Sequence, residues 1–219
     1  MLTVRPQAAG ISGAASSHPA LDIDGDFIVT DIQWALQTAF DNTIIKYSFI
    51  LNNYYPAHKS TGFTERNLTN NFASALEQVL GDQAFAWYEA PLSAEKKLHI
   101  DAIVFDKVRK SCFLIESKRF SNLNKKIVET KHDIQRMSHQ PHHEMLERGL
   151  GDFKIEHRYA VVLVDIWTEG KEKRSTYVDW PACLDSAPYE ITCRSGFESL
   201  ATDGQWKQNY KIMMAVKKL

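Results

Sequence analysis

Three charged residues, Asp101, Glu116 and Lys118, have the side-chain chemistry of a metal-binding site and lie in two short segments that predict β-strands. The segments are 98–106 (LHIDAIVFD) and 112–118 (CFLIESK), and both are rich in β-branched and aromatic residues. A short polar stretch separates them, as in a β-hairpin. Because side chains alternate along a strand, Glu116 and Lys118 share one face of the second strand.

The expected strand pairing brings the two carboxylates together. If the turn pairs Phe105 with Cys112, the antiparallel register places Asp101 opposite Glu116. Directly opposed side chains have Cβ atoms roughly 4.5–5.5 Å apart, and like charges at such positions destabilise a sheet. A cation between the carboxylates would remove this cost, and Lys118 supplies a further positive charge. The hairpin therefore predicts a site for a divalent metal ion.

This pattern, Asp101 followed by Glu-x-Lys at 116–118, resembles the active site of the PD-(D/E)XK nuclease superfamily, which has the restriction-endonuclease-like fold. Ile100 stands where that family usually has proline. The alternative interpretation is an ordinary surface hairpin with ion pairs. The apolar neighbours Phe113 and Ile115 favour the metal site over that alternative.

The resemblance implies a set of roles for these residues. Asp101 and Glu116, with the backbone carbonyl of Ser117, would bind one or two Mg²⁺ ions, for which Mn²⁺ would substitute. Glu65 matches an extra metal ligand that several branches of the superfamily carry on the first core helix. Glu65 also suits a second interpretation, because an acidic residue in a first turn stabilises the helix dipole by about 0.3–1 kcal/mol. Lys118 would position or activate the attacking water.

The helix after the hairpin carries Lys131 and Gln135 one turn apart, where many relatives have a substrate-contacting Gln or Lys. A solvated helix face explains both residues equally well. The resulting prediction is a metal-dependent nuclease that hydrolyses DNA, as an endonuclease rather than an exonuclease, with a restriction, repair, recombination or phage-defence role open. The alternatives are an inactive nucleic-acid-binding module of the same fold and a plain protein-interaction domain. A homodimer is compatible with all three.

The order of predicted elements agrees with the resemblance. Apolar spacings of three and four residues predict helices, and β-branched runs predict strands. The predicted helices are 31–51, 64–80 and 124–137, and the predicted strands are 85–88, 98–106, 112–118 and 159–167, with a turn at 170–174. From residue 64 onward this is the αβββαβ order of the restriction-endonuclease-like core. We expect an α/β fold with a central mixed sheet flanked by helices, formed by one domain over 26–219 with its core at about 64–180, after a flexible segment 1–25.

Composition limits the class of protein. The chain has 219 residues, 44% of them hydrophobic, and a net charge of −1, so DNA binding would depend on local basic patches rather than on the overall charge. Its three cysteines form no disulfide framework, and no apolar run reaches the roughly 20 residues that span a bilayer. The start of the chain does not resemble a signal peptide. We therefore expect a cytoplasmic protein with no membrane partner.

Four histidines between 132 and 143 raise the alternative of a zinc site. Their spacing matches no helical pair of ligands that is supported by a base, and Pro141 interrupts the segment. The favoured prediction is a polar loop.

Overall fold

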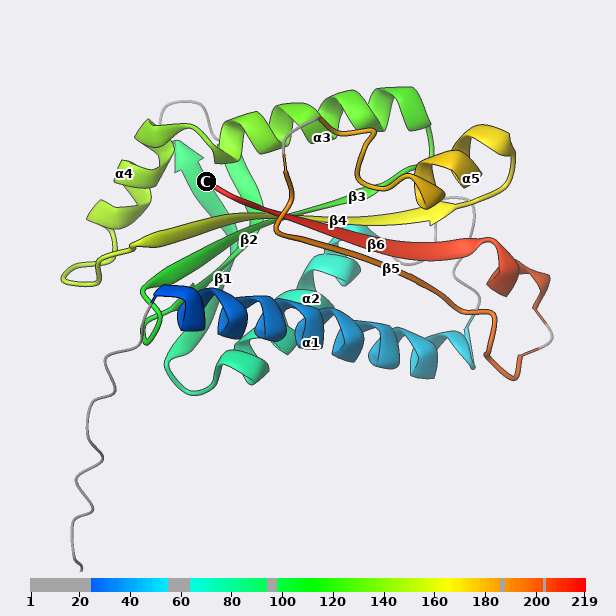
Figure 1. Ribbon diagram of the computed structural model, residues 1–219, viewed down its shortest axis with the longest axis horizontal. Helices are drawn as coiled ribbons and strands as arrows, with labels where there is room; N and C mark the ends of the chain where they lie inside the picture. The colour runs from blue at the N-terminus through cyan, green and yellow to red at the C-terminus, as the bar shows by residue number, and fades with distance from the viewer. Residues whose placement is uncertain (1–24, 55–63, 94–97, 186–187, 203) are drawn as a thin grey trace, which may run out of the picture.

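A computed structural model describes residues 25–54, 64–93, 98–185, 188–202 and 204–219 (Figure 1). The helices are α1 (Gly25–Leu51), α2 (Glu65–Leu80), α3 (Leu123–Met137), α4 (Gln140–Arg148) and α5 (Lys171–Val178), with the 3₁₀ helix η1 (Gln205–Gln208). The strands are β1 (Ala84–Ser93), β2 (Leu98–Asp106), β3 (Ser111–Arg119), β4 (His157–Trp167), β5 (Ile191–Gly196) and β6 (Tyr210–Lys218). In the part of the chain so described, no helix combines the length and apolar character needed to span a membrane. The predicted flexible segment lies almost entirely outside the described residues.

The strands form one open mixed sheet in the order β1-β2-β3-β4-β6-β5. Neighbouring strands are antiparallel except for β3 and β4, which are parallel. The prediction of an α/β fold with a central mixed sheet flanked by helices is confirmed. Strand β4 lies inside this sheet and is buried along most of its length, which explains its continuous apolar sequence.

Helices cover both faces of the sheet and produce two hydrophobic cores (Figure 1). Helices α1 and α2 pack on one face, where Leu36 and Phe72 contribute to the first core. Helices α3, α4 and α5 lie on the other face, where Met137 and Leu146 contribute to the second core. Successive side chains of β3 alternate between the two cores, so this strand is in contact with both helical layers.

Local sequence signals set the limits of α2, as predicted. Thr64 is the N-cap, and its side chain accepts a hydrogen bond from the backbone N–H of Asn67. Gly81 follows the helix with a φ of 90°, a conformation that glycine adopts without steric cost. The apolar stripe of α2, which includes Leu68 and Leu76, is buried against the sheet and α1.

Three local predictions were wrong. Strand β1 extends well beyond the predicted 85–88, because it pairs with β2 over nearly its whole length. The predicted turn at 170–174 is instead the N-cap Gly170 and the first residues of helix α5, which are good helix formers. Only Thr176 of this helix is buried, so no apolar stripe marks it. The predicted histidine loop is helix α4, in which Pro141 lies in the first turn, where proline is tolerated.

Candidate active site

The β2–β3 hairpin has the predicted register as far as Ala102, but the predicted pair of Asp101 with Glu116 is not part of the ladder. Phe105 pairs with Cys112, and the ladder continues to the pair of Ala102 and Ile115. Beyond that pair, the side chain of Asp101 takes the place of a backbone acceptor. Its Oδ2 accepts a hydrogen bond of 2.8 Å from the backbone N–H of Ser117. Asp101 is therefore fixed directly to the strand segment that carries the Glu-x-Lys residues.

The opposite edge of β2 is also irregular at Asp101. The ladder with β1 pairs Tyr88 with Ala102 and Ala90 with Ile100, and it omits the position between them, where Glu89 has a φ of 50°. A positive φ is unusual for a residue with a side chain and often marks a functional site. The break in the sheet on both sides of Asp101 leaves room for its side chain to face helix α2.

Helix α2 supports the site through the hydroxyl group of Thr69, which contacts the hydroxyl group of Ser117 on β3. The Oγ atoms of Thr69 and Ser117 lie 2.7 Å apart, and both side chains are buried. The Thr69 hydroxyl also lies 3.4 Å from Asp101 Oδ2. The Ser117 side chain is therefore a packing and positioning group, as expected from the face of β3 on which it lies.

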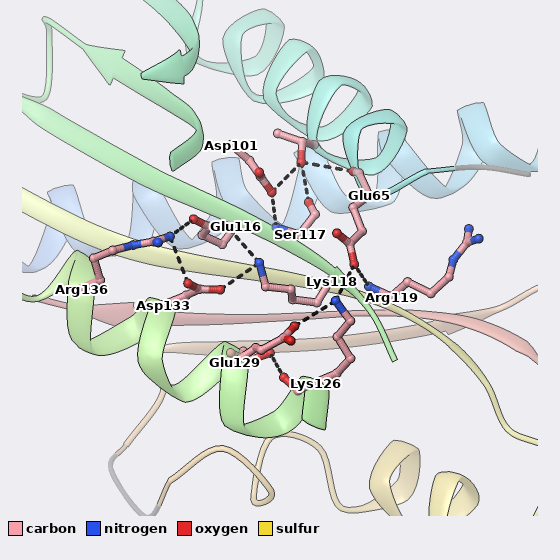
Figure 2. A network of polar contacts seen from close by, with 12 residues as sticks. Glu65, Asp101, Glu116, Ser117, Lys118, Arg119, Lys126, Glu129, Asp133 and Arg136 are labelled. Carbon is pink, nitrogen blue, oxygen red and sulfur yellow. Dashed lines mark hydrogen bonds and ion pairs between the residues drawn. The ribbon is translucent and has the colours of Figure 1, made fainter. Parts of the chain in front are cut away.

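On the other face of β3, four charged side chains form a closed set that we call the charge ring: Glu116, Lys118, Asp133 and Arg136 (Figure 2). Lys118 Nζ lies 3.1 Å from Glu116 Oε2 and 2.8 Å from Asp133 Oδ2. Arg136 contacts the other oxygen of Glu116 and lies 3.0 Å from Asp133 Oδ1. Each carboxylate of the ring thus contacts both cations.

Burial and like charge raise the proton affinity of the carboxylates. The pKa of Glu116 is raised to about 7, first by burial and then by the negative charge of Asp101, with Lys118 opposing. Burial also raises the pKa of Asp101, although the Ser117 N–H and Lys118 act in the opposite direction. Burial alone would lower the pKa of Lys118, but the Glu116 and Asp133 carboxylates outweigh it and raise that pKa well above its usual value.

An open cleft of about 840 Å³ borders the site on the side of α2. Asp101 and Glu65 both line it, together with Arg66, Arg119 and Lys126. Glu65 Oε1 accepts a hydrogen bond of 2.8 Å from the backbone N–H of Arg119 and lies 3.5 Å from Lys126 Nζ (Figure 2). This carboxylate therefore joins the first turn of α2 to the end of β3.

A second buried charge pair stabilises the end of β3. Arg119 lies 2.9 Å from Asp165 Oδ2 on β4, and the Tyr210 hydroxyl donates a 3.0 Å hydrogen bond to the same oxygen. Burial raises the pKa of Asp165 to about 6, against the opposing effects of Arg119 and the Tyr210 hydroxyl. The pairing connects the strand of the candidate site to β4 and β6.

The residues predicted from the sequence divide into two groups. Glu116, Ser117 and Lys118 lie consecutively at the end of β3, Asp101 bonds to the backbone of that segment, and Glu65 bonds to the residue that follows it. Lys131 and Gln135, in contrast, are exposed on α3, and neither makes a hydrogen bond or ion pair to the hairpin within the described residues.

Sequence reasoning missed Asp133 and Arg136, the two members of the charge ring that lie on α3. Asp133 borders the buried stripe of Ile134 and Met137, and Arg136 follows it by three residues. An acidic residue beside an apolar stripe is the signal that could have identified this pair, because a buried carboxylate requires a partner.

The possible metal donors of the site are carboxylate oxygens, which are the ligands that hard divalent cations prefer. The described residues contain no group of three or more His, Cys, Asp or Glu side chains arranged to hold a metal ion. Mg²⁺ commonly binds to one or two carboxylates and completes its coordination with waters and substrate phosphates. Asp101 and Glu116 supply two carboxylates whose charges interact, since the negative charge of Asp101 raises the pKa of Glu116. These carboxylates fit Mg²⁺ or Mn²⁺ with Asp101 at the open cleft, while Glu116 is buried and paired with Lys118 and Arg136.

Comparison with known proteins adds no relative. No protein-family model matches the chain, and neither a curated protein nor a solved structure matches it significantly. The fold and site define the protein as an α/β protein whose mixed six-stranded sheet carries a cluster of buried charges beside an open cleft.

Proposed function

We propose that this protein is a metal-dependent nuclease that hydrolyses phosphodiester bonds in DNA and acts as an endonuclease. The observation that carries the proposal is the contact of Asp101 with the Ser117 N–H, which joins a carboxylate at an open cleft to the strand segment that carries Glu116 and Lys118. The element order α2-β1-β2-β3-α3, followed after α4 by β4, agrees with the core expected from the resemblance.

Each residue of the site has a defined task in this reaction. Asp101 and Glu116 would hold the metal ion, with the Ser117 carbonyl as a further predicted ligand. When bound, the ion supplies Lewis-acid activation of water and charge neutralisation at the scissile phosphate. Lys118 stays protonated because two carboxylates surround its ammonium group. We therefore assign Lys118 to positioning the water and stabilising the negative charge on the phosphate, not to accepting a proton.

Cleavage assays with a panel of DNA substrates test the proposal. The panel contains supercoiled plasmid, linear duplex, branched and single-stranded DNA, each incubated with Mg²⁺, Mn²⁺, Ca²⁺ or a chelator. We expect cleavage with Mg²⁺ and Mn²⁺ but not with Ca²⁺, whose longer and looser coordination is a poor template for in-line attack. Nicking of closed circular plasmid would identify an endonuclease.

The matched control is a Glu116→Gln variant purified in parallel, which should be inactive on every substrate. Activity that persists in chelator, or equal activity of wild type and Glu116→Gln, would contradict the proposal. DNA binding by wild type without any cleavage would instead support an inactive nucleic-acid-binding module of the same fold.

A further inference from the structure

Both carboxylate oxygens of Glu116 are already in contact with cationic side chains. Oε2 lies 3.1 Å from Lys118 Nζ, and Oε1 contacts the guanidinium of Arg136. Only 4% of the Glu116 side chain is exposed, so little space remains for a third partner. A metal ion that binds to Glu116 must therefore replace one of these two cations.

Arg136 is the cation that the geometry allows to leave. Its guanidinium has a second acceptor, Asp133 Oδ1 at 3.0 Å, which remains available when Glu116 is withdrawn. Its Nε atom is buried without a hydrogen-bond partner among the described residues, so the observed position satisfies the guanidinium only in part. Lys118 contacts the same two carboxylates, but it extends from the strand that carries Glu116, whereas Arg136 reaches Glu116 from helix α3.

We propose that Arg136 is a positioning residue that neutralises Glu116 in the metal-free protein and yields its place to the metal ion, while Asp133 retains both Arg136 and Lys118 beside the site. This inference rests on the proposed function. Arg136 then competes with the metal and lowers its affinity before substrate binds. Loss of the one charge-assisted hydrogen bond between Arg136 and Glu116 corresponds to about a ten-fold change in the affinity for the metal ion.

Mn²⁺ binding to the full chain without DNA, measured by electron paramagnetic resonance of the free ion, tests the inference. We expect Arg136→Gln to bind Mn²⁺ about ten-fold more tightly than wild type. Arg136→Lys should also bind more tightly, although its net charge is unchanged, because the shorter lysine side chain carries a compact, strongly hydrated ammonium that holds the two carboxylates less firmly than the guanidinium nitrogen does. The control, Arg148→Gln, removes the same charge from an exposed position on α4 and should bind like wild type.

The outcomes separate this inference from the proposed function. If Glu116→Gln weakens Mn²⁺ binding but neither Arg136 variant binds more tightly than wild type, the role of Arg136 is refuted and the metal site stands. If Mn²⁺ binding does not depend on Glu116, both are refuted. Thermal melts establish that the variants are folded. If the Arg136 variants fail to fold, the Asp133→Asn variant replaces them in the test. Without the Asp133 carboxylate, Lys118 and Arg136 depend on Glu116 alone, so this variant should bind Mn²⁺ more weakly than wild type. An unchanged affinity would refute the inference.

Discussion

The raised pKa of Glu116 predicts that ionisation of this one side chain destabilises the metal-free protein. The folded state holds its proton more tightly than the unfolded chain does, because the pKa rises from 4.5 to about 7 on folding. The associated stability is fully present below pH 4.5, decreases as the pH rises, and is lost above the folded-state pKa of about 7. Glu116→Gln replaces the carboxyl with a neutral group of the same shape and should escape this loss.

The size of the effect follows from the two pKa values. A pKa change from 4.5 to about 7 corresponds to about 3 kcal/mol of unfolding free energy, at about 1.36 kcal/mol for each pH unit. The unfolding free energy of Glu116→Gln, relative to wild type, should therefore increase by about 3 kcal/mol between acidic and mildly alkaline pH. The ion pairs of Glu116 with Lys118 and Arg136 are already included in this value, because both cations oppose the rise in pKa.

Urea unfolding in chelator at a series of pH values measures this difference directly. The matched control is Glu156→Gln, because Glu156 is exposed on the surface, pairs with Lys110 and has a pKa that this pairing lowers. That variant should gain no stability over wild type as the pH rises. The reasoning is refuted if the difference between Glu116→Gln and wild type does not change with pH, or if it changes in the opposite direction.

Three further substitutions give separable results. Lys118→Ala should abolish DNA cleavage while Mn²⁺ binding is largely retained, and cleavage at the wild-type rate would show that the Glu-x-Lys assignment is wrong. Asp101→Asn should melt no lower than wild type in chelator, because the amide oxygen can still accept the Ser117 N–H hydrogen bond and a like charge is removed. The same variant should lose the stabilisation by Mg²⁺ or Mn²⁺. A clearly lower melting temperature in chelator would show that Asp101 is a structural partner in the fold instead. Glu65→Gln should reduce Mn²⁺ affinity if Glu65 is a ligand, whereas unchanged affinity with a lower melting temperature would assign it to the Arg119 N–H and the helix terminus.

The parts of the fold that local patterns determine were predictable. The hairpin register followed from apolar alternation and the position of the turn, and the limits of α2 followed from Thr64 and Gly81. Helix α5 was missed because its sequence is mostly polar and shows little apolar periodicity, and α4 was missed because it is short, mostly polar and has Pro141 in its first turn. The position of β6 between β4 and β5 depends on contacts between distant parts of the chain, for which a single sequence contains no local signal.

The site was predictable to the extent that it lies on the hairpin. Alternation placed Glu116 and Lys118 on one face, but it could not show that Asp101 would leave the ladder to bond with the Ser117 N–H. That departure depends on the break in β1, where Glu89 adopts a positive φ. Asp133 and Arg136 were missed because their role depends on how α3 is rotated against β3, a property of tertiary packing.

The two helical layers hold the site with different strength. On one side α2 buries seven side chains and is itself covered by α1, whereas α3 fully buries four, two of which, Thr130 and Asp133, are polar. Part of the attachment of α3 near the site is electrostatic, through ion pairs that burial protects from much of the screening by salt. Local unfolding of α3 therefore costs less free energy than unfolding of the sheet, and amide protons of α3 will exchange with solvent while those of β3 stay protected. Glu116 and Lys118 can in this way become accessible from the α3 side without loss of the strand that carries them.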